Sequence, residues 1–209
     1  MGAELLLVRH GETEGESSIR YHGRTDVALS ELGRAQMRAV ATKLSPEGFT
    51  HVFSSTMGRA VEGARLIAGA SAPIVCLKEF SEVDFGLFEG LTAEEISSRH
   101  PNEFERWRRD RLTSGYAYPG GESRAAFEAR VEAGLRRMLD SWDEDSGDSR
   151  ALLVAHRGVI RTIVRALVKV EPVIELGSIH ILERTPQWRV RELDIVSHLD
   201  GIDSHVTSG

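Results

Sequence analysis

The chain has 209 residues, of which 41% are hydrophobic and 28% charged, a composition typical of soluble globular proteins and not of disordered or membrane proteins. Its formal net charge of -6 argues against general nucleic-acid binding, and no apolar run approaches the roughly 20 residues of a membrane span. Cys76 is the only cysteine, so no intrachain disulfide can form, and the first residues lack a signal-peptide cleavage site. We therefore expect a cytoplasmic protein.

The first half of the chain alternates short apolar runs with segments of helical period. Leu5–Val8 is a short apolar run that predicts a buried strand, and it ends in Arg9, His10 and Gly11. After a polar loop, Ser30 is a predicted N-cap for a helix that ends at Ser45-Pro46. In chain order we expect a strand at 5–8, a helix at 30–45, a strand at 51–55, a helix at 57–70 and a strand at 73–77.

The second half contains the longest predicted helix and the clearest predicted strand. Thr92 and Glu95 form a capping-box pattern, and Pro101 suits the first turn of a further helix. From Arg106 to Gly121 we see no regular period and expect an irregular excursion. The remaining expected elements are a helix capped by Ser123, a strand at 151–155, a helix at 159–168 and a hairpin of strands near 179–182 and 188–193.

This alternation predicts an α/β fold of three layers, with a mostly parallel central sheet and helices on both of its faces. We expect a single domain over residues 1–199, a lid-like excursion at about 99–121, and a flexible tail at 200–209. Two of the strands run directly into a histidine, His10 and His156. If those strands are neighbours, both histidines lie at the carboxyl edge of the sheet, where such folds bind ligands.

Several short strings along the chain combine histidine, arginine, glutamate and glycine. In order and spacing they resemble the phosphatase-like branch of the histidine phosphatase superfamily, also called phosphoglycerate mutase-like, over nearly the whole chain. Taken singly, each residue has an ordinary structural interpretation, and the combination carries the resemblance. The strings are Arg9-His10-Gly11-Glu12-Thr13, Ser54-Ser55 with Arg59-Ala60, Glu82 with Phe85–Gly90, Tyr118-Pro119-Gly120-Gly121-Glu122-Ser123, and Ala155-His156-Arg157-Gly158.

The resemblance implies catalysis by five residues, and the chemistry of phosphoryl transfer explains their types. It makes His10 the residue that becomes phosphohistidine, His156 a hydrogen-bond donor to the phosphoryl group, and Glu82 the acid that protonates the leaving group. Arg9 and Arg59 can each offer a fork of donors to phosphate oxygens, and two guanidinium groups near His10 favour its neutral, nucleophilic form. Positioning and electrostatics carry most of the catalysis in such reactions.

The loop after His10 departs from the branch's pattern. Glu16 stands where relatives usually have a phosphate-binding asparagine, so that role is not carried over, and Ser17 or Ser18 could supply the donor instead. His22 and Arg157 also replace residues common in relatives, and Arg157 adds a cation that could meet a second substrate charge. Our substrate-binding candidates are therefore His22, Ser17, Arg157 and Gly11.

The predicted function is that of a phosphomonoester hydrolase acting on a small phosphorylated metabolite, with no metal, no cofactor and no nucleic-acid or membrane partner. No histidine pair has the spacing of a zinc motif. Three alternatives stay open: a phosphoglycerate mutase, a non-catalytic phospholigand-binding module, and a phosphoprotein phosphatase. The oligomeric state, including a homo-oligomer, also stays open. We interpret Arg106, Arg108, Arg109 and Arg111 as a solvated face and not as a second anion site.

Overall fold

The computed structural model describes residues 2–15, 19–45, 48–142 and 149–202, so Glu16, Ser17, Ser18 and the tail residues 203–209 lie outside the described residues. Among the described residues, one sheet has the strand order β3-β2-β4-β1-β5-β6. Its strands are β1 (Ala3–Arg9), β2 (His51–Ser55), β3 (Val75–Leu77), β4 (Arg150–Ala155), β5 (Ile179–Arg184) and β6 (Trp188–Ile195). The α-helices are α1 (Glu31–Leu44), α2 (Gly58–Ala68), α3 (Ala93–Arg99), α4 (Pro101–Asp110), α5 (Arg124–Ser141) and α6 (Arg157–Val168).

The sheet is mixed, with one strand reversed. The pairs β1/β4, β2/β4 and β2/β3 are parallel, whereas β5 runs antiparallel to both β1 and β6. Since β6 is reversed twice relative to β1, five of the six strands point the same way, which confirms the expected mostly parallel sheet. The expected hairpin of the last two strands is confirmed as well.

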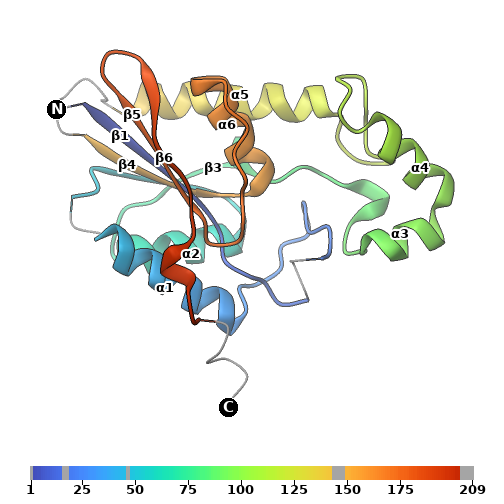
Figure 1. The fold of residues 1–209 in the computed structure, drawn as a ribbon, viewed down its shortest axis with the longest axis horizontal. Helices are drawn as coiled ribbons and strands as arrows, with labels where there is room; N and C mark the ends of the chain where they lie inside the picture. The colour runs from blue at the N-terminus through green and yellow to red at the C-terminus, as the bar shows by residue number, and fades with distance from the viewer. Residues whose placement is uncertain (1, 16–18, 46–47, 143–148, 203–209) are drawn as a thin grey trace.

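Helices cover both faces of the sheet, as Figure 1 shows, with α5 and α6 on one side and α1 and α2 on the other. The alternation of side chains along β1 decides which face each residue meets: Leu5 and Leu7 join the core under α5 and α6, while Leu6 and Val8 join the core over α1 and α2. All four side chains are fully buried. A continuous apolar run is therefore what a strand covered on both faces requires, and the three-layer architecture is confirmed.

The predicted N-caps of three helices, Ser30, Thr92 and Ser123, are confirmed. The Ser30 hydroxyl accepts from the Gly33 amide at the start of α1, and the Ser123 hydroxyl accepts from the Ala126 amide at the start of α5. Thr92 and Glu95 form the complete capping box of α3. These caps satisfy backbone donors that the first turn of a helix leaves without intrahelical partners.

The irregular excursion predicted from Arg106 to Gly121 is wrong in its first five residues, because α4 continues to Asp110. None of the residues of α4 is fully buried, so the helix leaves no apolar stripe for a periodicity argument to find. It is stabilised instead by Pro101 in its first turn, by stacking of Phe104 on Trp107 at 5.4 Å, and by local ion pairs such as Arg108 with Glu105. Figure 1 shows α3 and α4 projecting beyond the end of the sheet.

Two further properties concern the surface. No helix within the described ranges is long and apolar enough to cross a membrane. Cys76 is a free, exposed thiol on β3.

Candidate active site

The two histidines meet because β1 and β4 are neighbours in register. Arg9 pairs with Ala155 across the strands, and the His10 amide donates to the Ala155 carbonyl at 3.1 Å. Because the last residues of β1 and β4 are paired, His10 and His156 follow at the same edge of the sheet. Their rings lie edge to face with centroids 5.1 Å apart. The side chains are almost entirely buried, at 5% and 0% exposure.

The backbone after His10 sets the tautomer of its ring. Nδ1 lies 2.7 Å from the Gly11 carbonyl oxygen, and because a carbonyl only accepts, Nδ1 must carry the proton. The neutral ring therefore keeps its lone pair on Nε2. Gly11 itself does not line the cavity: a Cβ there would come within 2.4 Å of the Gly33 carbonyl oxygen, so the residue is a close-packed support for His10.

Both histidines are held neutral. Burial, and next to it the positive charges of Arg59 and Arg9, lower the pKa of His10 well below its usual value. Burial and Arg59 do the same to the pKa of His156. A neutral imidazole with a free Nε2 is the form that can attack an electrophile, so the expected effect of the two guanidinium groups is present in the structure.

Ser55, at the carboxyl end of β2, orients His156. Its hydroxyl lies 2.8 Å from His156 Nε2 and also accepts from the Met57 amide at 3.1 Å. His156 Nδ1 is buried and makes no hydrogen bond within the described chain. In the tautomer in which the Ser55 hydroxyl donates to Nε2, the imidazole proton is on Nδ1, where it can be donated to a bound ligand.

We expect Ser55→Ala to lower kcat/KM for the phosphomonoester hydrolysis predicted from the sequence by about 10-fold. This is the effect of losing one buried hydrogen bond that fixes the orientation of the His156 ring. The matched control is Ser54→Ala, since Ser54 is the adjacent, fully buried serine of β2 and its hydroxyl has no partner within the described residues. Steady-state hydrolysis of an aryl phosphate compares the two. Equal losses in both variants would mean that Ser55 acts only through the stability of β2.

The two arginines reach the site from different elements. Arg9 is the last residue of β1, and its Nη1 donates to the Ile174 carbonyl at 3.1 Å. Arg59, in the first turn of α2, is fully buried, and its guanidinium donates to the carbonyls of Thr25 and Gly23 at 2.8 Å each. The Nε atoms of both arginines are buried and have no hydrogen-bond partner in the part of the chain that the structure describes. Burial lowers the pKa of Arg9 to about 10 and lowers that of Arg59, so both stay charged at neutral pH.

Glu89 fixes the loop that holds Arg59. Its carboxylate accepts hydrogen bonds from the backbone amides of Gly23, Arg24 and Thr25, at 3.0 to 3.2 Å. The carbonyls of Gly23 and Thr25 in turn bind the Arg59 guanidinium. Glu89 is therefore a positioning residue for a phosphate-binding candidate.

Glu82 lies at the amino-terminal end of α6, where its carboxylate accepts from the Gly158 amide at 3.0 Å and from the Val83 amide at 3.0 Å. A Cβ at Gly158 would come within 2.5 Å of Glu82 Oε1, so a larger residue there would displace the carboxylate from this position. Arg130 of α5 holds the preceding loop through the carbonyls of Glu79 and Ser81, at 2.8 and 2.9 Å. It is itself paired with Glu122 at 2.7 Å.

A cavity of about 590 Å³ is lined by Arg9, His10 and Glu82, and also by His22 and Arg157. The His22 carbonyl accepts from Arg59 at 3.2 Å, and the buried Nδ1 of His22 has no hydrogen-bond partner among the described residues. Arg157 is exposed at the rim. Ser17, the remaining substrate-binding candidate, lies outside the described residues, as does Glu16. The structure thus brings together His10, His156, Glu82, Arg9 and Arg59.

The buried His180 supports the segment 174–178, part of which lines this cavity. Arg9 is bound by the segment 174–178 through the carbonyls of Ile174 and Ser178. Behind that segment the Ser178 hydroxyl lies 3.0 Å from His180 Nε2, and the Asp194 amide donates to His180 Nδ1 at 3.3 Å. His180 is fully buried, and burial lowers its pKa to about 4.

This lowered pKa predicts a loss of stability in acid. Below pH 6.5 the unfolded chain protonates His180 while the folded chain does not until about pH 4, so the free energy of unfolding falls as the pH falls through this window. Between pH 7 and 5 the expected contribution is about 2 kcal/mol. Urea unfolding at both pH values should show a shallower dependence in His180→Asn than in wild type, with His100→Asn as control. An identical pH dependence in wild type and His180→Asn would contradict the assignment.

The comparisons with known proteins agree with this geometry. The model of the histidine phosphatase superfamily (branch 1) matches residues 5–191. The chain belongs to the histidine phosphatase superfamily. It is 32% identical over 206 residues to phosphoglycerate mutase-like protein 4 of Arabidopsis thaliana, covering 95% of this chain and 87% of that protein.

Solved structures of histidine phosphatases share the fold. A putative alpha-ribazole-5'-P phosphatase of Escherichia coli superposes with a TM-score of 0.82 at 23% identity, over 93% of this chain and 97% of that one. A mycobacterial glucosyl-3-phosphoglycerate phosphatase, whose structure contains VO3, superposes with a TM-score of 0.78 at 29% identity, over 92% and 99%. The predicted phosphoglycerate mutase-like fold is confirmed.

Four residues that hold the candidate site groups of this superfamily member in place were not predicted as such from the sequence. Ser55, Glu89 and Glu122 stand inside strings that carried the family resemblance, so a signal for them existed. Arg130 had none, because it is one of several arginines on a long helix and its partners are backbone carbonyls remote in sequence. Among the described residues we find no group of three or more histidine, cysteine, aspartate or glutamate side chains placed to hold a metal ion.

Proposed function

We propose that this protein is a phosphomonoester hydrolase that acts through a phosphohistidine at His10 on a small phosphorylated metabolite. The observation that carries the proposal is a neutral His10, with its lone pair on Nε2, beside three buried nitrogens that have no hydrogen-bond partner among the described residues: Arg9 Nε, Arg59 Nε and His156 Nδ1. Buried donors are costly unless a ligand satisfies them, and a phosphate dianion offers acceptors for all three.

In the first step the phosphoryl oxygens bind Arg9, Arg59 and His156. His10 Nε2 attacks phosphorus, the bond from phosphorus to the ester oxygen breaks, and Glu82 transfers its proton to that oxygen as the alcohol leaves. In the second step Glu82 takes a proton from water, whose oxygen attacks the phosphohistidine. The bond between phosphorus and Nε2 breaks, and inorganic phosphate leaves.

The proposal includes catalysis without a metal ion, because guanidinium groups and His156 surround the site of transfer with positive charge and donors. A cytoplasmic location belongs to the same proposal. Its support is the exposed, free thiol of Cys76, which suits a reducing compartment.

Mutase activity is the second candidate, since the Arabidopsis relative carries a phosphoglycerate mutase-like name. The segment after Glu82 favours hydrolysis. It has Ser81-Glu82-Val83-Asp84-Phe85-Gly86 where mutases carry an Arg-Glu-Arg-His-Tyr-Gly element. This segment and the residue after it are hydrogen-bonded to the loop before α5. The Glu122 amide donates to the Asp84 carbonyl at 2.9 Å, and the Leu87 amide donates to the Pro119 carbonyl at 2.9 Å.

The test follows the fate of the phosphoryl group in the presence of chelator. The protein is mixed with 4-nitrophenyl phosphate, quenched, and analysed by mass spectrometry for a phosphoryl group on His10, while released inorganic phosphate is measured in parallel. The same measurement with 3-phosphoglycerate separates phosphate release from isomerisation. We expect phosphohistidine and free phosphate; isomerisation without net release would establish a mutase, and tight phosphate binding without either product would establish a binding module.

A further inference from the structure

A second cavity of about 550 Å³ adjoins the one that contains His10. Tyr21, Glu82, Phe85 and Arg157 line both cavities and therefore form their shared wall. His10 and Arg9 line only the first cavity. The second cavity thus begins where the catalytic acid stands and extends away from the nucleophile.

This arrangement determines where the leaving group goes. In phosphoryl transfer the nucleophile and the leaving oxygen lie roughly in line on opposite sides of phosphorus. The leaving oxygen must also lie within reach of Glu82, which gives it a proton. With His10 in the first cavity and Glu82 in the shared wall, the rest of the alcohol extends into the second cavity.

The wall of the second cavity is a connected set of aromatic rings. Phe85 contacts Tyr21 at 5.1 Å and Tyr118 at 5.0 Å between centroids, and Tyr118 contacts Tyr116 at 5.1 Å, all edge to face. Such packing holds the rings in fixed orientations. An apolar or planar portion of the alcohol would find a preformed surface there.

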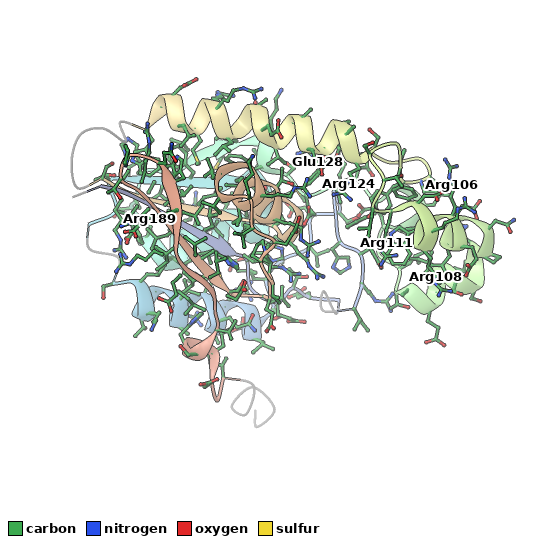
Figure 2. All side chains as sticks on the ribbon, turned by 45° about the horizontal axis from the view of Figure 1, so that its top comes forward. Arg106, Arg108, Arg111, Arg124, Glu128 and Arg189 are labelled. Atoms are coloured by element: carbon green, nitrogen blue, oxygen red, sulfur yellow. The ribbon has the colours of Figure 1, made fainter. Side chains whose placement is uncertain are left out.

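The cavity also holds an excess of positive charge. Its lining includes five arginines but only three carboxylates, one of which is Glu82. Two of the arginines are already paired, Arg124 with Glu128 at 3.0 Å and Arg165 with the same carboxylate at 2.5 Å. Figure 2 shows Arg111, Arg124 and Glu128 in the region between the body of the protein and α3–α4.

Of the other three arginines, Arg111 donates to the Arg108 carbonyl at 2.9 Å. Arg157 and Arg161, one turn apart on α6, remain available. Arg157 has no hydrogen bond or ion pair with any described residue, and Arg161 has only a long contact of 3.7 Å to Glu171. Burial and the charge of Arg157 lower the pKa of Arg161, as expected of a cation that lacks a close counterion.

Two buried polar atoms of residues in this lining make no hydrogen bond within the described chain: Arg161 Nε and Tyr116 Oη. Both can donate, and the arginine side chain can only donate. A set of unsatisfied donors in a positively charged cavity fits an anion and would disfavour a cation.

We propose that the preferred substrate of this enzyme is a phosphomonoester whose alcohol carries a second anionic group, a carboxylate or a further phosphate, and that Arg157 and Arg161 bind that group. This inference rests on the proposed function. Arg108, Arg109 and Arg111 of the arginine-rich segment are exposed, as the sequence predicts. Arg111 also contributes to the lining of this cavity, with its guanidinium over the Trp107 ring at 4.7 Å.

The test uses three aryl phosphates that differ only in a remote substituent. 4-(Carbamoylmethyl)phenyl phosphate is the neutral reference, 4-(carboxymethyl)phenyl phosphate carries a carboxylate of the same shape, and 4-(phosphonomethyl)phenyl phosphate carries a phosphonate. The methylene spacer keeps the phenol's leaving ability nearly constant. The readout is kcat/KM of each anionic ester divided by kcat/KM of the neutral ester, in wild type, Arg157→Gln, Arg161→Gln and the control Arg189→Gln. Arg189 lies on β6, far from the cavity in Figure 2, and is exposed.

We expect at least one anionic ester to be favoured by about 10-fold or more in wild type, and this ratio to fall by about 10-fold in each cavity variant. The ester with the larger ratio identifies the anion. Because the ratio compares two esters within the same variant, a general loss of activity does not change it. Arg157, at the exposed rim, provides the test through Arg157→Gln if Arg161→Gln does not fold. A wild-type ratio near one, or ratios unchanged in both variants, would overturn the inference while leaving the proposed function intact. Absence of phosphate release from all three esters would overturn both.

Discussion

His10→Ala is expected to lower kcat for phosphomonoester hydrolysis by about 10⁴-fold or more, the scale of losing the group that forms the covalent intermediate. The neighbouring His156 is not arranged to take its place. The Nε2 lone pair is set by the hydrogen bond from Nδ1 to the Gly11 carbonyl, whereas His156 has its Nε2 bound to Ser55. The variant should fold, because the ring is at the edge of the sheet and outside both apolar cores.

The measurement is release of inorganic phosphate from 4-nitrophenyl phosphate with chelator present, together with thermal unfolding to establish that the variant is folded. His100→Ala serves as the control, since this histidine separates α3 from α4 and lines neither cavity. Substantial residual turnover in folded His10→Ala would remove His10 as the nucleophile. Loss of turnover in both variants would point to damage unrelated to the nucleophile.

Glu82→Gln should produce the second large effect, and its size should depend on the leaving group. An alkyl ester such as glycerol 2-phosphate expels a strongly basic alkoxide that needs a proton, so we expect a decrease of kcat/KM of about 10²–10⁴-fold. 4-Nitrophenolate leaves without a proton, so the corresponding decrease for 4-nitrophenyl phosphate should be about 10-fold or less. The amide substitution keeps the size of the side chain and one acceptor for the Gly158 or Val83 amide.

Glu79→Gln is the matched control for this experiment. Glu79 belongs to the same loop, but its carboxylate faces Arg137 at 3.3 Å, and the backbone carbonyl that binds Arg130 is untouched by the substitution. Decreases of equal size for the alkyl and the aryl ester in Glu82→Gln would exclude Glu82 as the acid. A further check comes from the second step, where accumulation of phosphoenzyme in Glu82→Gln would show that the same group activates water.

The fold was largely determined by local sequence signals. The apolar run Leu5–Val8 could only be a strand covered on both faces, and Ser30, Thr92 and Ser123 each placed the start of a helix that the structure confirms. These signals act over a few residues and can therefore be recognised without knowledge of the tertiary structure. The error at α4 has the opposite origin, since that helix buries no residue completely and its stabilising contacts are between partly exposed side chains.

The candidate catalytic residues were also visible in the sequence, because each stands in a short string beside a strand or helix end. Their adjacency was not. It depended on β1 and β4 pairing in register, a contact between segments about 145 residues apart that no local pattern encodes. Only the assembled sheet places His10 and His156 with their rings 5.1 Å apart.

The sequence by itself determined the α/β class, the order of the elements and the chemical identity of the groups that could transfer a phosphoryl group. The tertiary structure alone decided their protonation and their surroundings. The tautomer of His10 follows from one carbonyl 2.7 Å away, and its low pKa follows from burial and two arginines on different elements. The second cavity exists because α4, α5 and α6 each contribute residues to its lining. These properties are electrostatic and depend on distances between groups remote in sequence, which composition and periodicity do not contain.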